Sequence, residues 1–347
     1  MDTIEISLRI NQNLGIDYMQ NFIGKINTLK SPYGNTFCDV LEVSNTGNLI
    51  IKISYPRYFL GNNAYLITKR SECFEVQKYF VDNIMKDPYW KDNIGEINLL
   101  RVDIPFTYQM RDNEEFNSYE NVFQICAIVY NKTKNKARPK AFIDMIDRKL
   151  ETVIYSDNGK SDKSSNNKLM IYNQYLNLNQ KLDEEVFEET LKAYGDLPYR
   201  IRMEVSKRVR LRKSFNGQEF ANLDILANYF EQYKNYILDY VLNKDEIDWQ
   251  YNLWSEQLAK ILIESRAKGN FNYEVFILQN LSTIYDYEIL RRALGIGIDN
   301  LSTRENSITR VRKILNSIQQ EKNIIVMDTY AVLMKMRETI LNYRLMD

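Results

Sequence analysis

The sequence predicts an α+β protein, with a ferredoxin-like, split βαβ antiparallel sheet followed by an all-helical part. Apolar and polar residues alternate over 3–10, which is typical of a half-buried strand. Apolar residues at helical spacing follow over 16–29, and the order strand, helix, strand, strand, helix, strand continues as far as residue 107. From 219 to 344 nearly every segment has the helical period. The sheet is therefore expected in the first part of the chain.

The individual elements follow from the same periodicities. In the first part we expect strands over 3–10, 36–44, 48–55 and 97–107, and helices over 16–29 and 72–86. The next segment is interpreted as a second, imperfect copy of this layout, with strands over 121–131, 152–156, 168–175 and 199–213 and an acidic helix over 183–194. The character of the chain changes after Gly217. This change predicts one domain over 1–216 and a helical domain over 217–347.

The composition excludes several kinds of catalysis. None of the 347 residues is histidine, which excludes Ser-His-Asp and Cys-His catalysis and histidine-ligated zinc. Any metal ion must bind to oxygen ligands, which favours Mg²⁺ or Mn²⁺ as the cofactor. Cys38, Cys73 and Cys126 are far apart in sequence and are expected to be reduced core residues.

The location of the protein is predicted from its apolar segments. Asp2, Glu5 and Arg9 interrupt the start of the chain, so no signal peptide is expected. No apolar run approaches the ~20 residues of a membrane span. We therefore expect a cytoplasmic protein that makes no membrane contact.

The charges are balanced in total but segregated along the chain. The 46 basic and 46 acidic residues cancel. Residues 200–213 nevertheless contain seven lysines and arginines against one glutamate, a local net charge of 7 − 1 = +6. Strand alternation places Arg200, Arg202, Glu204, Ser206, Arg208, Arg210 and Arg212 on one face. Such a row is suited to a phosphate backbone; the alternative is that the arginines pair with the acidic helix over 183–194.

Three side chains could perform chemistry beside these arginines. Asp103 shares a strand face with Arg101, as either a paired surface charge or a metal ligand. Glu204 either neutralises its neighbours or joins Asp103 in binding a divalent ion, with Asp39 or Glu42 as a third ligand. Tyr172 is either a packing residue or a nucleophile that attacks phosphorus.

These motifs resemble those of a known family. The order R-V-D at 101–103, I-Y-S-D-N-G-K-S at 154–161, I-Y-N-Q at 171–174 and R-M-E at 202–204 is similar to that of rolling-circle plasmid replication initiators of the Rep_trans type. It also resembles the filamentous-phage gene II replication proteins. Gln174 stands where a lysine is usual, and the His-hydrophobic-His metal motif of the wider relaxase superfamily is missing.

The resemblance implies an enzyme that nicks and rejoins one DNA strand at a replication origin. Tyr172 would hold the 5′ end covalently, and Asp103 and Glu204 would bind Mg²⁺ or Mn²⁺. Tyr155 and Tyr175 are alternative nucleophiles. The implied partners are origin DNA as a single strand or hairpin, a host helicase or polymerase, and a second copy of the chain, with residues 1–216 as the nicking domain. The alternatives are a non-catalytic, sequence-specific DNA-binding replication or regulatory protein, and an RNA-processing or unrelated interaction protein.

The helical domain over 217–347 has a DNA-binding signal of its own. Ser302-Thr303-Arg304-Glu305 forms a capping box before an apolar helical stripe, and the segment 286–294 precedes it. The two segments resemble a helix-turn-helix, although the turn over 295–302 is longer than usual. An ordinary surface helix pair is the alternative. The side chains expected to contact DNA here are Arg304, Ser307, Arg310, Arg312 and Lys313.

Overall fold

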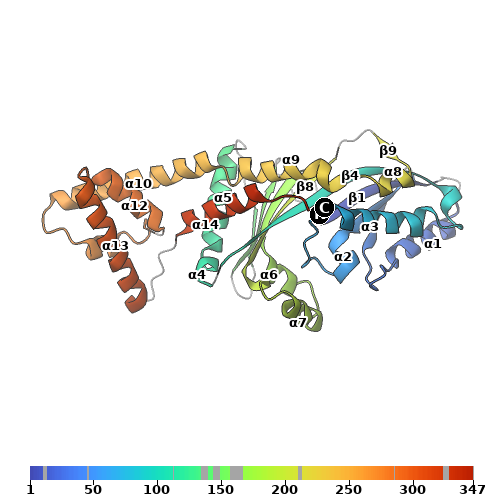
Figure 1. Cartoon of the computed structure of the whole chain (residues 1–347), viewed down its shortest axis with the longest axis horizontal. Helices are drawn as coiled ribbons and strands as arrows, with labels where there is room; N and C mark the ends of the chain where they lie inside the picture. Colours follow the sequence, from blue (N-terminus) through green and yellow to red (C-terminus); the bar gives the residue numbers. More distant parts are fainter. Residues whose placement is uncertain are drawn as a thin grey trace. The chain divides into compact units, whose positions relative to one another are not determined.

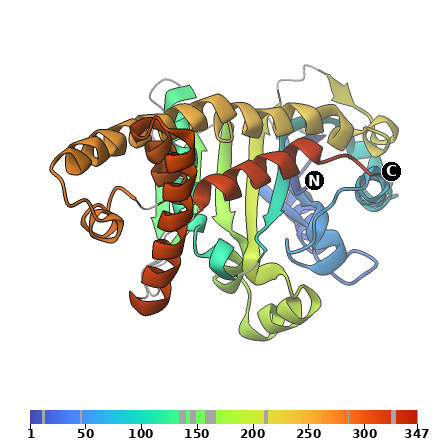
Figure 2. The same ribbon diagram turned by 60° about the vertical axis from the view of Figure 1, so that its left-hand side comes forward.

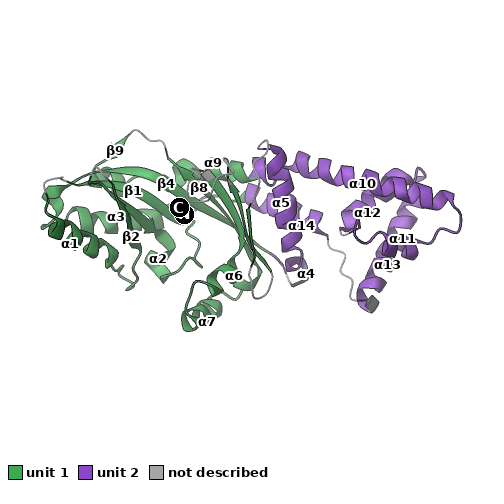
Figure 3. Ribbon diagram, turned by 180° about the vertical axis from the view of Figure 1, so that it is seen from behind, with its two compact units in different colours: residues 1–109, 137–237, 342–347 green, residues 110–136, 238–341 purple. Residues whose placement is uncertain are grey.

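The chain forms two compact units in the computed structural model. Unit 1 contains Met1–Gln109, Ala137–Ile237 and Asn342–Asp347, and unit 2 contains Met110–Lys136 and Leu238–Leu341 (Figure 3). The predicted boundary near residue 216 lies inside unit 1. No helix within the described ranges is long and apolar enough to cross a membrane. The structure describes residues 1–10, 14–44, 47–111, 113–133, 140–143, 149–156, 167–209, 213–284, 286–322 and 328–346.

Unit 1 is built on an antiparallel sheet, which in the described chain has nine strands and confirms the α+β prediction (Figure 1). The strand order is β2-β3-β1-β4-β8-β7-β6-β5, and β9 pairs with β4. The strands are β1 (Thr3–Ile10), β2 (Cys38–Val43), β3 (Leu49–Ser54), β4 (Ile94–Gln109), β5 (Lys140–Ile143), β6 (Leu150–Ser156), β7 (Asn167–Asn173), β8 (Arg200–Arg208) and β9 (Ser214–Phe215).

The two halves of the sheet are connected differently. Strands β1 to β4 alternate with helices and lie in the order β2-β3-β1-β4, whereas β5 to β8 lie in consecutive order. The second half therefore does not repeat the strand order of the first.

Helices cover the apolar face of the sheet. Helix α9 crosses the strands (Figure 2), and its Phe230 ring lies 5.3 Å from that of Phe106 on β4. Gln77 of α3 donates a hydrogen bond to the carbonyl of Phe220 in α8 (2.7 Å). The helical segments of unit 1 are α1 (Ile16–Asn27), α2 (Tyr55–Leu60), α3 (Arg70–Phe80), a π-helical turn (Val81–Met85), 3₁₀ turns (Lys91–Asn93 and Leu197–Tyr199), α6 (Gln174–Asn179), α7 (Glu184–Ala193), α8 (Gly217–Ala221) and α9 (Ile225–Tyr240).

The central strands are buried on both faces. On β8, Ile201, Met203 and Val205 are buried on one face, while Arg202 and Glu204 are buried on the other. A buried polar face is unusual, because charged groups lose their hydration unless they have partners. This face therefore contains the candidate active site.

One predicted strand is wrong. Residues 121–131 are not a strand but lie within a helix, α5 (Tyr119–Thr133). Its buried residues Val122, Cys126 and Val129 have helical spacing and form one side of that helix. The apolar residues are dense enough to satisfy either period. The segment that contains them, the 15 residues of α5, is longer than an ordinary strand, and this length favours the helix.

The regular elements of unit 2 are all helices within its described residues. Its helices pack through buried apolar faces, as α12 does with Ile289, Leu290, Ala293 and Leu294. A Cβ atom at Gly297, where α12 ends, would lie 3.1 Å from the Leu262 side chain of α10, so a larger residue would require that side chain to shift by a few tenths of an ångström. Besides α5, the helices are α4 (Asn113–Phe116), α10 (Lys244–Ala267), α11 (Tyr273–Gln279), α12 (Tyr287–Gly297), α13 (Leu301–Lys322) and α14 (Thr329–Asn342).

Candidate functional site

The three predicted catalytic and metal-binding residues lie on one face of adjacent strands. In the antiparallel registers, Asp103 of β4 faces Ser206 of β8, and Tyr172 of β7 faces Arg202 of β8. Paired residues of an antiparallel ladder project to the same side. Glu204 stands between the two pairs on β8, so this face carries all three side chains.

Tyr172 and Glu204 are in direct contact. The Tyr172 hydroxyl donates a hydrogen bond to Oε2 of Glu204 (3.1 Å). Tyr172 is only 4% exposed, and this burial raises the pKa of its phenol well above the ordinary value. Among its neighbours, the Arg202 charge lowers this pKa while the Glu204 charge raises it. In this arrangement Tyr172 is a neutral hydrogen-bond donor.

Glu204 is buried among other acids on this face. Its pKa is raised from 4.5 to about 7, first by burial and then by the carboxylates of Asp2 and Asp103, against the opposing effect of Arg202 and Arg101. Burial likewise raises the pKa of Asp103. Three neighbouring carboxylates therefore share this face, and Glu204 is partly protonated near neutral pH.

Arg101 neutralises part of this acidic group. Its Nε and Nη2 atoms each donate to one oxygen of Asp103, both at 2.8 Å. Nε also donates to the Ser206 hydroxyl (2.7 Å) and Nη1 to Glu5 (2.8 Å). The planar guanidinium thus binds Asp103 in a bidentate pair, the geometry that arginine favours with carboxylates.

Arg202 is buried as completely as an apolar core residue, at 1% exposure. Its Nη2 donates to Asp2 (3.0 Å) and its Nη1 to the carbonyl of Asn63 (2.5 Å), whereas its Nε has no hydrogen-bond partner. Asp2 lies 200 positions away in sequence. In this conformation the Arg202 guanidinium is not accessible to a phosphate group from solvent.

The remaining arginines of the basic strand have different surroundings. Arg200 donates twice to Asp196 (2.7 and 2.6 Å) and once to the carbonyl of Ala64 (2.9 Å). Arg208 is exposed at the end of β8, while Arg210 and Arg212 lie outside the described residues. Arg200 and Arg202 therefore take their acidic partners, Asp196 and Asp2, from outside the helix over 183–194 that the sequence suggested.

The expected third metal ligands lie too far along the sheet to reach Asp103 and Glu204. Asp39 forms an ion pair with Arg57 (2.6 Å), and Glu42 is exposed. Both lie on β2, three strand spacings from β4, which corresponds to roughly 14 Å. Within the described parts of the chain, no group of three or more acidic or cysteine side chains is arranged to hold a metal ion.

The alternative nucleophiles lie elsewhere. Tyr155 is opposite Leu169 in the ladder and faces the apolar side of the sheet, away from Glu204. Tyr175 lies in α6, where its ring packs 5.2 Å from that of Phe187. Of the three candidate tyrosines, Tyr172 is the one in contact with Glu204.

The predicted helix pair in unit 2 exists with a shorter turn. Three residues, 298–300, separate α12 from α13, which matches the usual length in a helix-turn-helix. The predicted capping box is wrong, because Asn300 caps α13 by accepting from the backbone N–H of Thr303 (2.9 Å). Ser302 consequently lies within the helix.

The polar residues of α13 have separate local roles. Arg304 donates to the carbonyl of Ile298 (3.0 Å), and Ser307 is buried, where it accepts from the Tyr273 hydroxyl (2.8 Å). The Arg310 and Arg312 guanidinium groups lie over aromatic rings at 5.5 and 5.0 Å. Arg310, Arg312 and Lys313 remain exposed.

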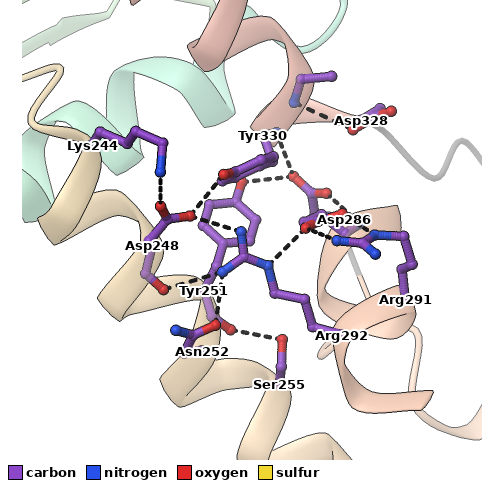
Figure 4. A network of polar contacts seen from close by, with 12 residues as sticks. Lys244, Asp248, Tyr251, Asn252, Ser255, Asp286, Arg291, Arg292, Asp328 and Tyr330 are labelled. Carbon is purple, nitrogen blue, oxygen red and sulfur yellow. Dashed lines mark hydrogen bonds and ion pairs between the residues drawn. The ribbon is translucent and has the colours of Figure 1, made fainter. Parts of the chain in front are cut away.

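A partly buried polar junction fixes α12 to α10 and α14 (Figure 4). Asp286, the N-cap of α12, accepts from the Tyr251 hydroxyl (2.7 Å) and from the backbone N–H groups of Glu288 (2.9 Å) and Tyr330 (3.1 Å). Arg292 then donates to Asp248 (2.8 Å) and Glu288 (2.7 Å). We call Asp248, Tyr251, Asp286, Glu288, Arg292 and Tyr330 the helical junction.

The sequence analysis missed several of these residues. Asp2 was interpreted only as a charge that interrupts a signal peptide, and Glu5 also as a polar residue of the first strand, yet both bind arginines of the candidate site. Alternation placed Glu5 on the polar side of its strand but gave no sign of its partner Arg101. Asp286 shows the ordinary N-cap signal, an Asp before a helical stripe. No sequence pattern pairs Asp2 with Arg202.

Comparisons with known proteins found no relative of this chain. The chain matches no protein-family model, no curated protein and no solved structure.

Proposed function

We propose that this protein is a rolling-circle replication initiator that nicks and rejoins one DNA strand through a phosphotyrosine at Tyr172. One observation carries the proposal: the Tyr172 hydroxyl lies 3.1 Å from Glu204, with Asp103 on the same face of an adjacent strand. The sequence motifs that contain these residues resemble those of such initiators. A split βαβ unit formed by β1 to β4 is part of the proposal, supported by their order β2-β3-β1-β4.

The contact between Tyr172 and Glu204 suggests how the nucleophile is activated. Glu204 has a pKa of about 7, which suits a general base at neutral pH. The phenol passes its proton to Glu204 as its oxygen attacks phosphorus. The bond from phosphorus to the 3′ oxygen breaks, and Glu204 returns the proton to that oxygen. The products are a 5′-phosphotyrosine and a free 3′-hydroxyl, and the reverse sequence rejoins the strand.

A divalent cation belongs to this proposal, and the donor set fits one. Glu204 and Asp103 present hard oxygen ligands, and their mutual repulsion, seen in the raised pKa of Glu204, is what a bound cation relieves. Mg²⁺ or Mn²⁺ held by these two carboxylates would polarise the scissile phosphate as a Lewis acid. Arg101 must then release at least one oxygen of Asp103, which it binds through both.

The described conformation is a closed form under this proposal. Tyr172, Glu204 and Arg202 are buried, so DNA must displace what covers them. The segment at Asn63 and Ala64 contributes to the cover, because its carbonyls accept from Arg202 and Arg200. Opening this segment would expose both guanidinium groups and remove one carbonyl partner from each, so that the phosphate backbone could compete with Asp2 and Asp196 for them.

The test is a search for a covalent adduct. Single-stranded DNA of random sequence, labelled at its 3′ end, is incubated with the protein and Mn²⁺, and labelled protein is detected on a denaturing gel. We expect an adduct with the wild type and with Tyr175→Phe, and none with Tyr172→Phe. An equal adduct with Tyr172→Phe removes this residue from the mechanism. No adduct with any variant, on single-stranded or supercoiled DNA, contradicts the proposed activity.

A second candidate is a DNA-binding replication or regulatory protein without catalytic activity. The observation that favours it is the burial of Tyr172 at 4% exposure together with the bidentate engagement of Asp103. Under this reading the polar face of the sheet is structural and unit 2 binds DNA. DNA binding without any adduct is the result that supports it.

A further inference from the structure

The exposed side of α13 carries a continuous polar stripe. Side chains at alternating spacings of four and three residues share one face of an α-helix. None of the residues at these spacings is acidic or apolar, and all are exposed. The first and the last of them are 18 positions apart, or about 27 Å along the helix. The polar stripe consists of Ser302, Asn306, Thr309, Lys313, Asn316 and Gln320.

The opposite side of α13 anchors the helix. Ser307, Val311, Leu315 and Ile318 are buried at the complementary spacing. Ser307 is bonded to both Tyr273 (2.8 Å) and the carbonyl of Thr303 (2.7 Å). Figure 1 shows α13 projecting from the end of α10. The polar stripe is therefore presented by a helix whose rotation is fixed.

The charges of α13 complement an anionic partner. Between residues 302 and 320 the helix carries Arg304, Arg310, Arg312 and Lys313 against Glu305, a net charge of 4 − 1 = +3. Arg310 and Arg312 flank the polar stripe, each placed over a tyrosine ring. A positive helix whose central stripe carries one lysine among amides and hydroxyls has the composition of a base-reading surface with phosphate contacts at its edges.

We propose that the polar stripe of α13 reads base edges in the major groove of duplex DNA. The inference rests on the proposed function and specifies how the DNA is recognised. An α-helix of 10–12 Å diameter fits a major groove about 12 Å wide. Asn306 and Asn316 suit adenine, and Lys313 suits guanine. Arg310 and Arg312 contact the flanking phosphates and contribute affinity without sequence preference.

This assignment differs from the one made from sequence. The residues that the sequence analysis singled out on α13 include Arg304 and Ser307, but the structure ties Arg304 to the end of α12 and buries Ser307. Asn306, Thr309 and Asn316, which it did not name, carry the specificity together with Lys313, which it did. Their pattern is visible only when the buried side of the helix is known.

The experiment is selection of duplexes from a random 30-base-pair DNA library, followed by affinity measurements on the selected sequence and a scrambled one. We expect the wild type to select a defined sequence. Asn306→Ala and Lys313→Ala should each lose about tenfold affinity for the selected duplex and little for the scrambled one. Arg310→Ala should weaken both equally and lower the salt dependence by about one counterion. Lys260→Ala, an exposed lysine on α10, is the matched control and should change neither.

Three results would overturn the inference. They are selection of no sequence, equal weakening of both duplexes by Asn306→Ala, and a preference for duplex RNA or for a protein ligand. The adduct assay on single-stranded DNA does not depend on α13, so the two proposals fail separately. An adduct without a selected duplex rejects only the polar stripe, and a selected duplex without an adduct rejects only the nicking activity. The variants replace exposed side chains, and unchanged unfolding temperatures confirm that they fold.

Discussion

The candidate site of unit 1 and the helical junction of unit 2 contain the same pair of groups in different surroundings. In each, a buried tyrosine donates to a buried carboxylate, Tyr172 to Glu204 at 3.1 Å and Tyr251 to Asp286 at 2.7 Å. Burial is the largest cause that raises the pKa of each carboxylate, to about 7 for Glu204 and about 6 for Asp286. The neighbours of the two carboxylates make the difference.

Asp286 is surrounded by donors, whereas Glu204 is surrounded by other acids. The Tyr251 hydroxyl and two backbone N–H groups lower the pKa of Asp286, opposed among its neighbours by Asp328. For Glu204 the next causes after burial are the carboxylates of Asp2 and Asp103, which raise the pKa. A carboxylate satisfied by donors holds helices together. A carboxylate crowded by like charges is suited to accept a proton or a cation.

The largest expected effect is on the ion pairs of unit 1. Arg202→Met should lower the free energy of unfolding by about 3–5 kcal/mol, because it leaves Asp2 as a buried charge without its partner. Arg208→Met, on the same face of the same strand but exposed, should change it by less than about 0.5 kcal/mol. Urea denaturation measures both. Equal effects would mean that Arg202 is not held as described.

The next effect concerns the pH dependence of stability in unit 2. The pKa of Asp286 rises from 3.8 in the unfolded chain to about 6 in the folded one. The folded state therefore binds this proton more tightly, and the associated stability, about 3 kcal/mol, is present below pH 4 and is lost as the pH rises through about 6.

Asp286→Asn keeps an N-cap oxygen but removes this titration. We expect the variant to lose the decline in stability between pH 4 and 6, as followed by thermal unfolding at several pH values. Asn243→Asp places a titratable cap on α10 at a more exposed position and is the control. An unchanged pH profile in Asp286→Asn would contradict the raised pKa.

The carboxylates Glu204 and Asp286 should also differ in their response to a metal ion. Mn²⁺ at 100 times its dissociation constant should stabilise the folded chain by about 2.7 kcal/mol. Asp103→Asn and Glu204→Gln should abolish this gain, while Asp286→Asn should keep it. Thermal unfolding with and without Mn²⁺ measures the difference. Loss of the gain in Asp286→Asn would place the metal in unit 2.

The smallest effect is that of the tyrosine hydroxyls. Tyr251→Phe should lower the free energy of unfolding by about 1.5 kcal/mol, because Asp286 loses a hydrogen-bond donor while it is ionised at neutral pH. Tyr172→Phe should lower the free energy of unfolding by about 0.5 kcal/mol. Glu204 is partly protonated at neutral pH, so its hydrogen bond with Tyr172 is less charge-assisted. Denaturation at pH 7 compares the two, and a reversed order would overturn the contrast between the clusters.

Local patterns predicted most of the elements. Alternation over 3–10 matches β1, and the acidic helix over 183–194 matches α7 within one residue at each end. The strand predicted over 121–131 failed because its dense apolar residues fit both periods. Such runs are decided by what packs against them, which a single sequence does not contain.

The sequence by itself determined which side chains share a strand face, because alternation is a local property of the backbone. It therefore placed Glu204 with Arg202, and Asp103 with Arg101. Only the tertiary structure decided which strands are neighbours, and so brought Tyr172 to Glu204 and Asp2 to Arg202. Burial and charge pairing depend on these long-range contacts, so the raised pKa of Glu204 and the burial of Tyr172 were beyond any local pattern.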